Sequence, residues 1–278
     1  MSELDKKVQW KVVDTSKFQQ GKVDFTALKA EGFQGVIIRA NDPDTGEAMA
    51  KDPYFDRDYM RAKNAGLYVG AYWFTLATSI EYGMREAEKF ANYTDGKQFD
   101  LPLYIDLENS KTLALGISFC TDLISHVCTY LQNKRRKFVG VYCSSGIYPS
   151  VVEKSIREKF CCWIADYRGY VGYKENYGIW QYGYTRTKAD CNGQVDIDGD
   201  ICYVDYPTAI KNRGLNGYPK PAPKLMYKVT KDTPIVQFEG TEPAGRTVQV
   251  LGRKTLCGVQ YGRVTKDGWI SLKDAKQI

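Results

Sequence analysis

The sequence lacks the short motifs of several large enzyme classes. It contains no G-x-S-x-G nucleophile turn, no phosphate-binding P-loop and no G-x-G-x-x-G dinucleotide segment. His126 is the single histidine and stands in a stretch with helical spacing, without a nucleophile motif beside it. A Ser-His hydrolase and a nucleotide-binding fold are therefore disfavoured, and we expect neither a metal nor another cofactor.

Long apolar runs are also missing. No run approaches the roughly 18 residues that span a membrane, and residues 1–10 are polar, without the apolar core of a signal peptide. We therefore expect no membrane insertion. We also expect a protein that is made in the cytoplasm without a signal peptide and released by other means if it acts outside the cell.

The cysteines form no recognisable framework. The chain has 8 of them, but no C-x-x-C pair and no cluster with histidine. A chain of 278 residues does not need disulfides to hold a core. We expect reduced and mostly buried thiols.

The excess of positive charge is confined to one end of the chain. Residues 215–278 carry 11 Lys and Arg against 5 Asp and Glu, whereas residues 1–214 carry 28 of each. A basic module on a neutral body indicates an anionic partner such as a cell-wall polymer, a nucleic acid or a membrane. The alternative is that the charge only aids solubility.

The pattern of the chain divides it into two domains. Residues 212–224 are rich in Gly and Pro without apolar periodicity, which predicts an extended linker. Residues 1–211 precede it as one domain. Residues 225–278 follow as short strand-like runs between Gly, Pro and charged turns, which is typical of a small all-β barrel.

In the first domain, short apolar runs alternate with amphipathic stretches. The strand-like runs are 10–13, 35–40, 68–74, 103–107, 138–143, 162–165, 179–182 and 194–197, and the helical stretches are 24–31, 54–65, 80–93, 118–133 and 147–159. This alternation predicts an α/β fold, a TIM-like parallel barrel. Late connections too short for full helices predict an incomplete helical ring.

Two acids end one apolar run. In the segment LPLYIDLE, Asp106 and Glu108 stand two residues apart and would point to the same side of a strand. In a parallel barrel, the C-terminal strand ends line the active site. Neighbouring carboxylates raise each other's pKa, so that one of them becomes a proton donor near neutral pH.

Two further acids occupy comparable positions. Asp14 ends the first strand-like run and Asp196 lies in the last, and these strands are neighbours in a closed barrel. Four acids around one apolar opening suit the cleavage of a glycosidic bond. Asp14 could instead cap a following helix.

Aromatic residues gather at the same strand ends, where flat rings suit the apolar faces of sugars. Any one of them could also be core packing. The candidate substrate-binding residues are Tyr72, Trp73, Tyr142, Asp166 and Trp180.

These segments resemble glycoside hydrolase family 25, the lysozymes of bacteriophage endolysins and bacterial autolysins. The resemblance rests on VDTSKFQ at 13–19, DPYFDRDYMRAKNAGLYVGAYWF at 52–74, PLYIDLE at 102–108, WIADY at 163–167, and WQYG and GQVDID between 180 and 198. It covers nearly all of residues 8–206.

The family resemblance implies a muramidase that cleaves the β-1,4 bond between N-acetylmuramic acid and N-acetylglucosamine of peptidoglycan. It implies Glu108 as the general acid and Asp106 as the group that orients the acetamido substituent or a water molecule. Asp14 and Asp196 would complete an acidic floor. The sequence departs from the family at residues 39–46 and at Trp73, where histidine is usual.

The tail resembles a bacterial SH3-like cell-wall-binding domain, chiefly through YGRVTKDGWISL at 261–272. This resemblance favours the cell wall over nucleic acid as the partner of the basic tail. The whole chain then indicates a phage endolysin released through a holin. The alternatives are a non-catalytic glycan-binding protein, a hydrolase of another polysaccharide such as chitin, and a tail that only stabilises the enzyme.

Overall fold

The computed structural model describes residues 8–45, 49–190 and 196–220, and parts of the C-terminal region. The described C-terminal residues are 225–229, 233–234, 241–242, 246–256, 259–264 and 269–277. The chain forms two compact units, residues 1–220 and 221–278.

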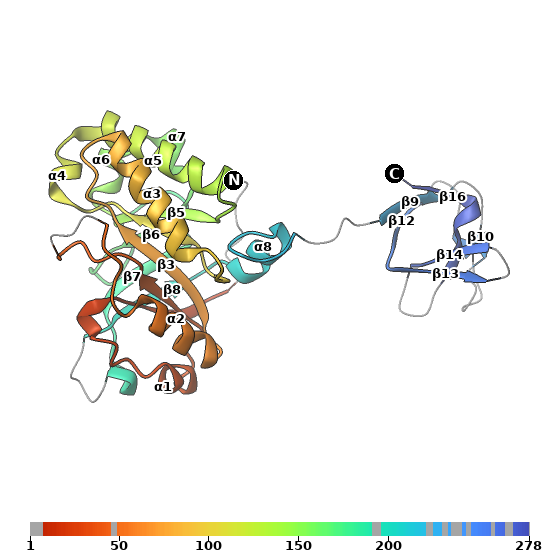
Figure 1. The fold of residues 1–278 in the computed structure, drawn as a ribbon, viewed down its shortest axis with the longest axis horizontal. Helices are drawn as coiled ribbons and strands as arrows, with labels where there is room; N and C mark the ends of the chain where they lie inside the picture. Colours follow the sequence, from red (N-terminus) through yellow and green to blue (C-terminus); the bar gives the residue numbers. More distant parts are fainter. Residues whose placement is uncertain are drawn as a thin grey trace. The chain divides into compact units, whose positions relative to one another are not determined.

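The first unit is built on a closed barrel of eight strands in sequential order (Figure 1). The strands are β1 (Trp10–Thr15), β2 (Gly35–Arg39), β3 (Tyr68–Phe74), β4 (Leu103–Asp106), β5 (Val139–Ser144), β6 (Cys161–Ala165), β7 (Ile179–Tyr184) and β8 (Asp198–Cys202). Neighbouring strands from β1 to β7 pair in parallel, so the predicted barrel is confirmed for these seven strands.

The last strand departs from the prediction. β8 is antiparallel to both β1 and β7. A parallel strand needs a long crossover, usually a helix, but the described residues between β7 and β8 contain only the short 3-10 helix η2 (Lys188–Asp190). The strand also begins later than expected. Asp196 and Ile197 precede it, and Gln194 and Val195 lie outside the described residues.

Helices cover the outside of the barrel, and α3 and α5 pack against one another (Figure 1). The helices are α1 (Phe25–Ala30), α2 (Phe55–Asn64), α3 (Ile80–Thr94), α4 (Ser110–Leu113), α5 (Gly116–Asn133), α6 (Tyr148–Val151), α7 (Lys154–Arg157) and α8 (Tyr206–Arg213). Residues 166–178, between β6 and β7, contain no helix, so the ring is incomplete as predicted. The expected helix at 147–159 is broken into α6 and α7.

Residues 212–220 belong to the barrel unit instead of the predicted linker. Asn216 is fully buried; its side chain accepts a hydrogen bond from the Phe138 amide at 2.7 Å and donates to the Leu101 carbonyl at 3.1 Å. The Tyr218 hydroxyl donates to Asp100. These contacts close the end of the barrel at which the parallel strands begin, which composition alone did not reveal.

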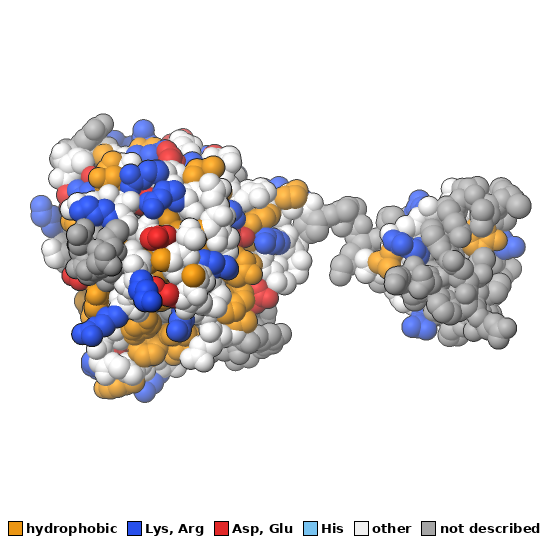
Figure 2. All heavy atoms as spheres, turned by 90° about the horizontal axis from the view of Figure 1, so that it is seen from below, with side chains coloured by type: hydrophobic (Ala, Val, Ile, Leu, Met, Phe, Trp, Pro, Cys, Tyr) orange, Lys and Arg blue, Asp and Glu red, His pale blue; other side chains and the backbone are white. Residues whose placement is uncertain are grey.

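The barrel unit shows no concentrated basic patch on the face drawn in Figure 2, and its described cysteines form no disulfides. On the face drawn in Figure 2, its Lys and Arg side chains are dispersed among hydrophobic and polar ones. The six cysteines of the described residues are buried and free, while Cys191 and Cys257 lie outside these residues. In the described part of the chain, no helix is long and apolar enough to cross a membrane.

The second unit consists of short strands. The strands are β9 (Leu225–Val229), β10 (Thr233–Pro234), β11 (Thr241–Glu242), β12 (Thr247–Val250), β13 (Gly252–Leu256), β14 (Val259–Arg263), β15 (Trp269–Ser271) and β16 (Ala275–Gln277). They form antiparallel sheets in the orders β12-β9-β16, β13-β14-β15 and β10-β11. Val248, Val250 and Ile270 form a small apolar core.

Candidate active site

A pocket of about 260 Å³ opens where the parallel strands of the barrel end. Asp14 belongs to β1, and Arg39, Phe74 and Asp106 are the last residues of β2, β3 and β4. Because β8 runs the other way, its first residue, Asp198, lies at the same end and pairs with Asp14. The pocket is lined by Asp14, Ser16, Phe18, Gln19, Arg39, Pro43, Asp44, Tyr72, Phe74, Asp106, Glu108 and Asp198.

The acid pair of the sequence analysis lies in this pocket. Asp106 is 3% exposed, and the described chain offers its Oδ1 atom no hydrogen-bond partner. Burial, followed by the charges of Glu108 and Asp14, raises the pKa of Asp106 well above its usual value, against the opposing effect of Arg39. Glu108 reaches solvent at the pocket mouth. Desolvation by the pocket walls and the charge of Asp198 raise the pKa of Glu108.

Asp14 lies on the floor of the pocket and does not cap a helix. The following 3-10 helix η1 (Lys17–Gln19) is capped by Ser16, whose side chain accepts from the Phe18 amide. Asp14 itself is 8% exposed and accepts a hydrogen bond from the Gln181 side chain at 2.6 Å. Burial and the charge of Asp198 raise the pKa of Asp14 well above its usual value.

The fourth acid is Asp198 and not Asp196. Asp196 is exposed before the strand begins and does not line the pocket. The antiparallel β8 starts four residues later than expected, so that its first residue, Asp198, points into the pocket and Asp200 points into the barrel below it. Asp200 is fully buried, and its Oδ1 atom accepts from the Trp163 indole N–H at 2.7 Å.

Arg39 is the basic residue among the pocket-lining side chains, and it is 5% exposed. Its Nε atom lies 3.6 Å from an oxygen of Asp52, and its guanidinium lies 5.0 Å from the ring centre of Phe18. Neither Nε nor Nη2 donates a hydrogen bond to a described residue. Arg39 lowers the pKa of both Asp14 and Asp106, so it favours their ionised forms.

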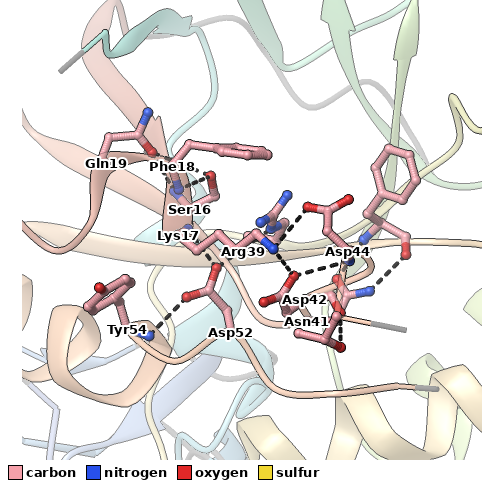
Figure 3. Close-up of polar contacts among 12 residues, drawn as sticks. Ser16, Lys17, Phe18, Gln19, Arg39, Asn41, Asp42, Asp44, Asp52 and Tyr54 are labelled. Atoms are coloured by element: carbon pink, nitrogen blue, oxygen red, sulfur yellow. Dashed lines mark hydrogen bonds and ion pairs between the residues drawn. The ribbon is translucent and has the colours of Figure 1, made fainter. Parts of the chain in front are cut away.

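One wall of the pocket is held by Lys17 (Figure 3). Its ammonium group pairs with Asp42 and, at 3.1 Å, with Asp44, and its backbone amide donates to Asp52 at 2.7 Å. These contacts fasten the segment after β2 to the turn after β1. The segment is therefore a fixed part of the pocket rim, and it is the segment in which the sequence departs from the family pattern.

Four of the five predicted substrate-binding residues do not line the pocket. Trp73 is 1% exposed and packs against Phe90 and Tyr93 of α3, because alternation along β3 turns it outward while Tyr72 faces the pocket. Trp180 is also turned outward on β7, since Ile179 and Gln181 face the barrel interior.

Asp166, the third of these residues, stabilises a loop. Its buried carboxylate accepts from Ser145 at 2.6 Å, from the Gly172 amide at 2.8 Å and from the Arg168 guanidinium. The hydrogen bond from Arg168 holds the pKa of Asp166 well below its usual range. Tyr142 is buried beneath the pocket and bonds to Gln181 at 2.7 Å.

Among the residues that line the pocket, Phe18, Arg39 and Asp198 were not predicted. Gln181, which bonds to Asp14 below the pocket, was not predicted either. Phe18 is 64% exposed at the rim. Arg39 and Gln181 could have been predicted from the alternation of side chains along a strand. Each follows an inward-facing isoleucine, Ile37 or Ile179, by two residues and therefore faces the same side. Asp198 could not, because the direction of β8 was unknown.

A barrel whose strand ends carry four clustered acids and exposed rings defines a glycosidase-type site. Residues 13–191 match the family model of glycosyl hydrolases family 25. The chain therefore belongs to glycosyl hydrolases family 25, and the prediction that it is a glycoside hydrolase is confirmed.

A curated relative is the autolytic lysozyme of Clostridium acetobutylicum, 30% identical over 187 residues. The match covers 64% of this chain and 52% of the relative, so the chain spans about half the length of that protein.

Solved structures share the fold. The CTP1L endolysin aligns with a TM-score of 0.60 and 23% identity over 73% of this chain and 70% of that one. A family 25 glycosyl hydrolase from Bacillus anthracis aligns with a TM-score of 0.57 and 21% identity over 70% and 88%. The modular autolysin LytC from Streptococcus pneumoniae aligns with a TM-score of 0.62 and 17% identity over 70% and 47%.

Proposed function

We propose that this chain is a muramidase that hydrolyses the β-1,4 bond between N-acetylmuramic acid and N-acetylglucosamine in peptidoglycan. The observation that carries the proposal is the convergence of Asp106 and Glu108 with Asp14 and Asp198 in one pocket of a family 25 barrel. The name of the curated relative, an autolytic lysozyme, supports the same substrate.

Glu108 is the proton donor in this proposal. Its raised pKa favours the protonated form, and its place at the pocket mouth gives it access to the glycosidic oxygen and to solvent protons. Asp106, deeper in the pocket, orients the acetamido group or the attacking water. Asp14 and Asp198 place negative charge where the sugar ring becomes positive in the transition state.

The test is digestion of purified peptidoglycan by the wild type and by Glu108→Gln, followed by borohydride reduction and mass spectrometry. Reduced N-acetylmuramic acid ends from the wild type alone support the proposal. Reduced N-acetylglucosamine ends would mean that the other glycosidic bond is cut. Release of chitin oligosaccharides without muramic ends would favour the hydrolase of another polysaccharide, and no new ends would favour a glycan-binding protein.

The second unit is proposed to be an SH3-like domain that binds the cell wall. Support comes from its antiparallel strands, its small apolar core and the basic excess of residues 215–278. The truncation that tests this role ends at Lys220, because Asn216 and Tyr218 are part of the barrel unit.

The truncated chain should cleave soluble glycan fragments like the full chain but bind whole walls more weakly, with the largest difference at low salt. Equal binding by both chains would contradict the targeting role. Release through a phage holin stays a prediction; co-expression of the chain with and without a holin, with lysis as the readout, tests it.

A further inference from the structure

Gln181 is the centre of a hydrogen-bonded chain below the pocket. It is 4% exposed, and its Nε2 atom donates to Oδ2 of Asp14 at 2.6 Å. Its Oε1 atom accepts from the hydroxyl groups of Tyr142 at 2.7 Å and of Tyr167 at 2.8 Å. One buried amide therefore joins an acid of the pocket to two tyrosines.

The two tyrosines determine which way the amide faces. Both phenols donate to Oε1, which uses both lone pairs of the amide oxygen, and the NH₂ group therefore points at Asp14. An NH₂ group only donates. The Asp14 oxygen opposite it therefore accepts. A carboxylate accepts on either oxygen, whereas the neutral acid accepts well only on its carbonyl oxygen, so this hydrogen bond favours the carboxylate.

The hydrogen bond from Gln181 and the other surroundings of Asp14 shift its pKa in opposite directions. Burial and the charges of Asp198 and Glu108 raise the pKa of Asp14, whereas the Gln181 hydrogen bond and the charge of Arg39 lower it. The charged and titratable groups that face or approach Asp14 are Arg39 of β2, Tyr72 of β3, Asp106 and Glu108 at the end of β4, Tyr167 after β6, and Asp198 and Asp200 of β8. Gln181 does not titrate, and it donates a hydrogen bond directly to Asp14.

Tyr167 connects the amide to the surface. Its side chain is 64% exposed although its hydroxyl group reaches the buried Gln181. The ring lies against the backbone at Gly183, where a Cβ atom would be 3.4 Å from it. Burial raises the pKa of Tyr167, and the charges of Asp198, Asp14 and Glu108 raise it further, so the ring lies within reach of the acids of the pocket. An exposed ring at this place offers a stacking surface for a sugar.

We propose that Gln181 and Tyr167 are positioning residues for the hydrolysis. Gln181 holds Asp14 on the pocket floor as a hydrogen-bond-accepting carboxylate, and Tyr167 links this amide to a sugar ring bound at the pocket mouth. The assignment of Tyr167 to a sugar rests on the proposed function. The hydrogen bond from Gln181 to Asp14 is present in the folded chain without substrate, so its effect on Asp14 can be measured without substrate.

The first arm of the experiment measures Asp14 directly, by ¹³C NMR titration of labelled carboxyl groups in the full chain, with Asp14→Asn for assignment. Gln181→Met removes the donor at similar size and should raise the pKa of Asp14 by about one unit. Gln181→Glu is a second variant of nearly identical shape and should raise it in the same direction. An unchanged titration of Asp14 in either folded variant would overturn the role of Gln181.

The second arm uses kcat and KM on soluble, uncrosslinked peptidoglycan chains. Gln181→Met should lower kcat about tenfold with little change in KM, and should move the acidic limb of the pH profile to higher pH. Tyr167→Phe keeps the ring and should lower kcat by a smaller factor, whereas Tyr167→Ala should in addition raise KM. Tyr170→Phe, at a tyrosine that is also exposed, is the matched control and should behave as the wild type.

The outcomes separate the two proposals. Wild-type kinetics for both Tyr167 variants would overturn the role of Tyr167. A wild type that produces no muramic ends would refute the proposed function, and the titration of Asp14 would still decide whether Gln181 holds that carboxylate.

Discussion

Two layers of side chains fill the barrel of this protein, and they differ in chemistry although they lie only two residues apart along each strand. The layer toward the start of the parallel strands is apolar and includes Val12, Ile37, Tyr104, Ile179 and Cys202. The layer toward the pocket is polar and includes Asp14, Arg39, Asp106, Gln181 and Asp198. Since side chains alternate along a strand, each strand contributes one residue to stability and the next inward residue to the site.

The comparison predicts that mutations at the pocket lower kcat, whereas mutations at the opposite end of the barrel lower stability. The largest effect is expected for Glu108→Gln, which removes the proton donor at the pocket mouth and should lower kcat about 10²- to 10⁴-fold. Thermal unfolding should stay close to that of the wild type, because Glu108 is exposed. Initial rates on purified peptidoglycan measure the effect. A variant with a tenth of the wild-type rate would contradict the assignment.

At the opposite end, Asn216→Ala should affect stability and not chemistry. It removes two hydrogen bonds to the backbone at Phe138 and Leu101, and it places alanine at a φ of 53°. We expect a loss of about 2–4 kcal/mol in the free energy of unfolding. Urea denaturation measures this loss. A reduced kcat of the enzyme that remains folded would contradict the claim that this end of the barrel affects only stability.

The third prediction compares neighbouring acids at the start of β8. Asp198→Asn should lower kcat about tenfold or more, because Asp198 lines the pocket. Asp196→Asn is the matched control and should retain most of the activity, because Asp196 is exposed outside the pocket. The reverse result would show that the site uses the acid favoured by the sequence and not the one placed by β8.

The smallest effect is expected below the pocket, at Asp200. Burial raises the pKa of Asp200 well above its usual value, so the folded protein holds this proton more tightly than the unfolded chain. The stability from this group is present at acidic pH and is lost as the pH rises. Asp200→Asn should therefore raise the melting temperature by a few degrees at pH 7 and by less at pH 4. A lower melting temperature at pH 7 would contradict this account.

Much of the barrel could be predicted from the sequence. Apolar runs of strand length alternate with amphipathic stretches, and this alternation identified seven strands and the larger helices. The Asp106 and Glu108 pair could be placed as well, because two residues at an i, i+2 spacing on a strand must share a side. Residues 212–220 were misjudged, since Gly and Pro content does not reveal that Asn216 fills a buried site.

The sequence by itself determined where seven of the eight barrel strands and the larger helices form, and that acids end the apolar run at Asp106, because hydrophobic period and residue type are local properties. The tertiary structure decided which acids meet. The antiparallel direction of β8 brings Asp198 beside Asp14, alternation along β3 sends Trp73 outward, and barrel closure brings Gln181 against a residue 167 positions away. Such outcomes depend on strand direction and closure, which are set by packing between distant segments and are not encoded in any single stretch of the chain.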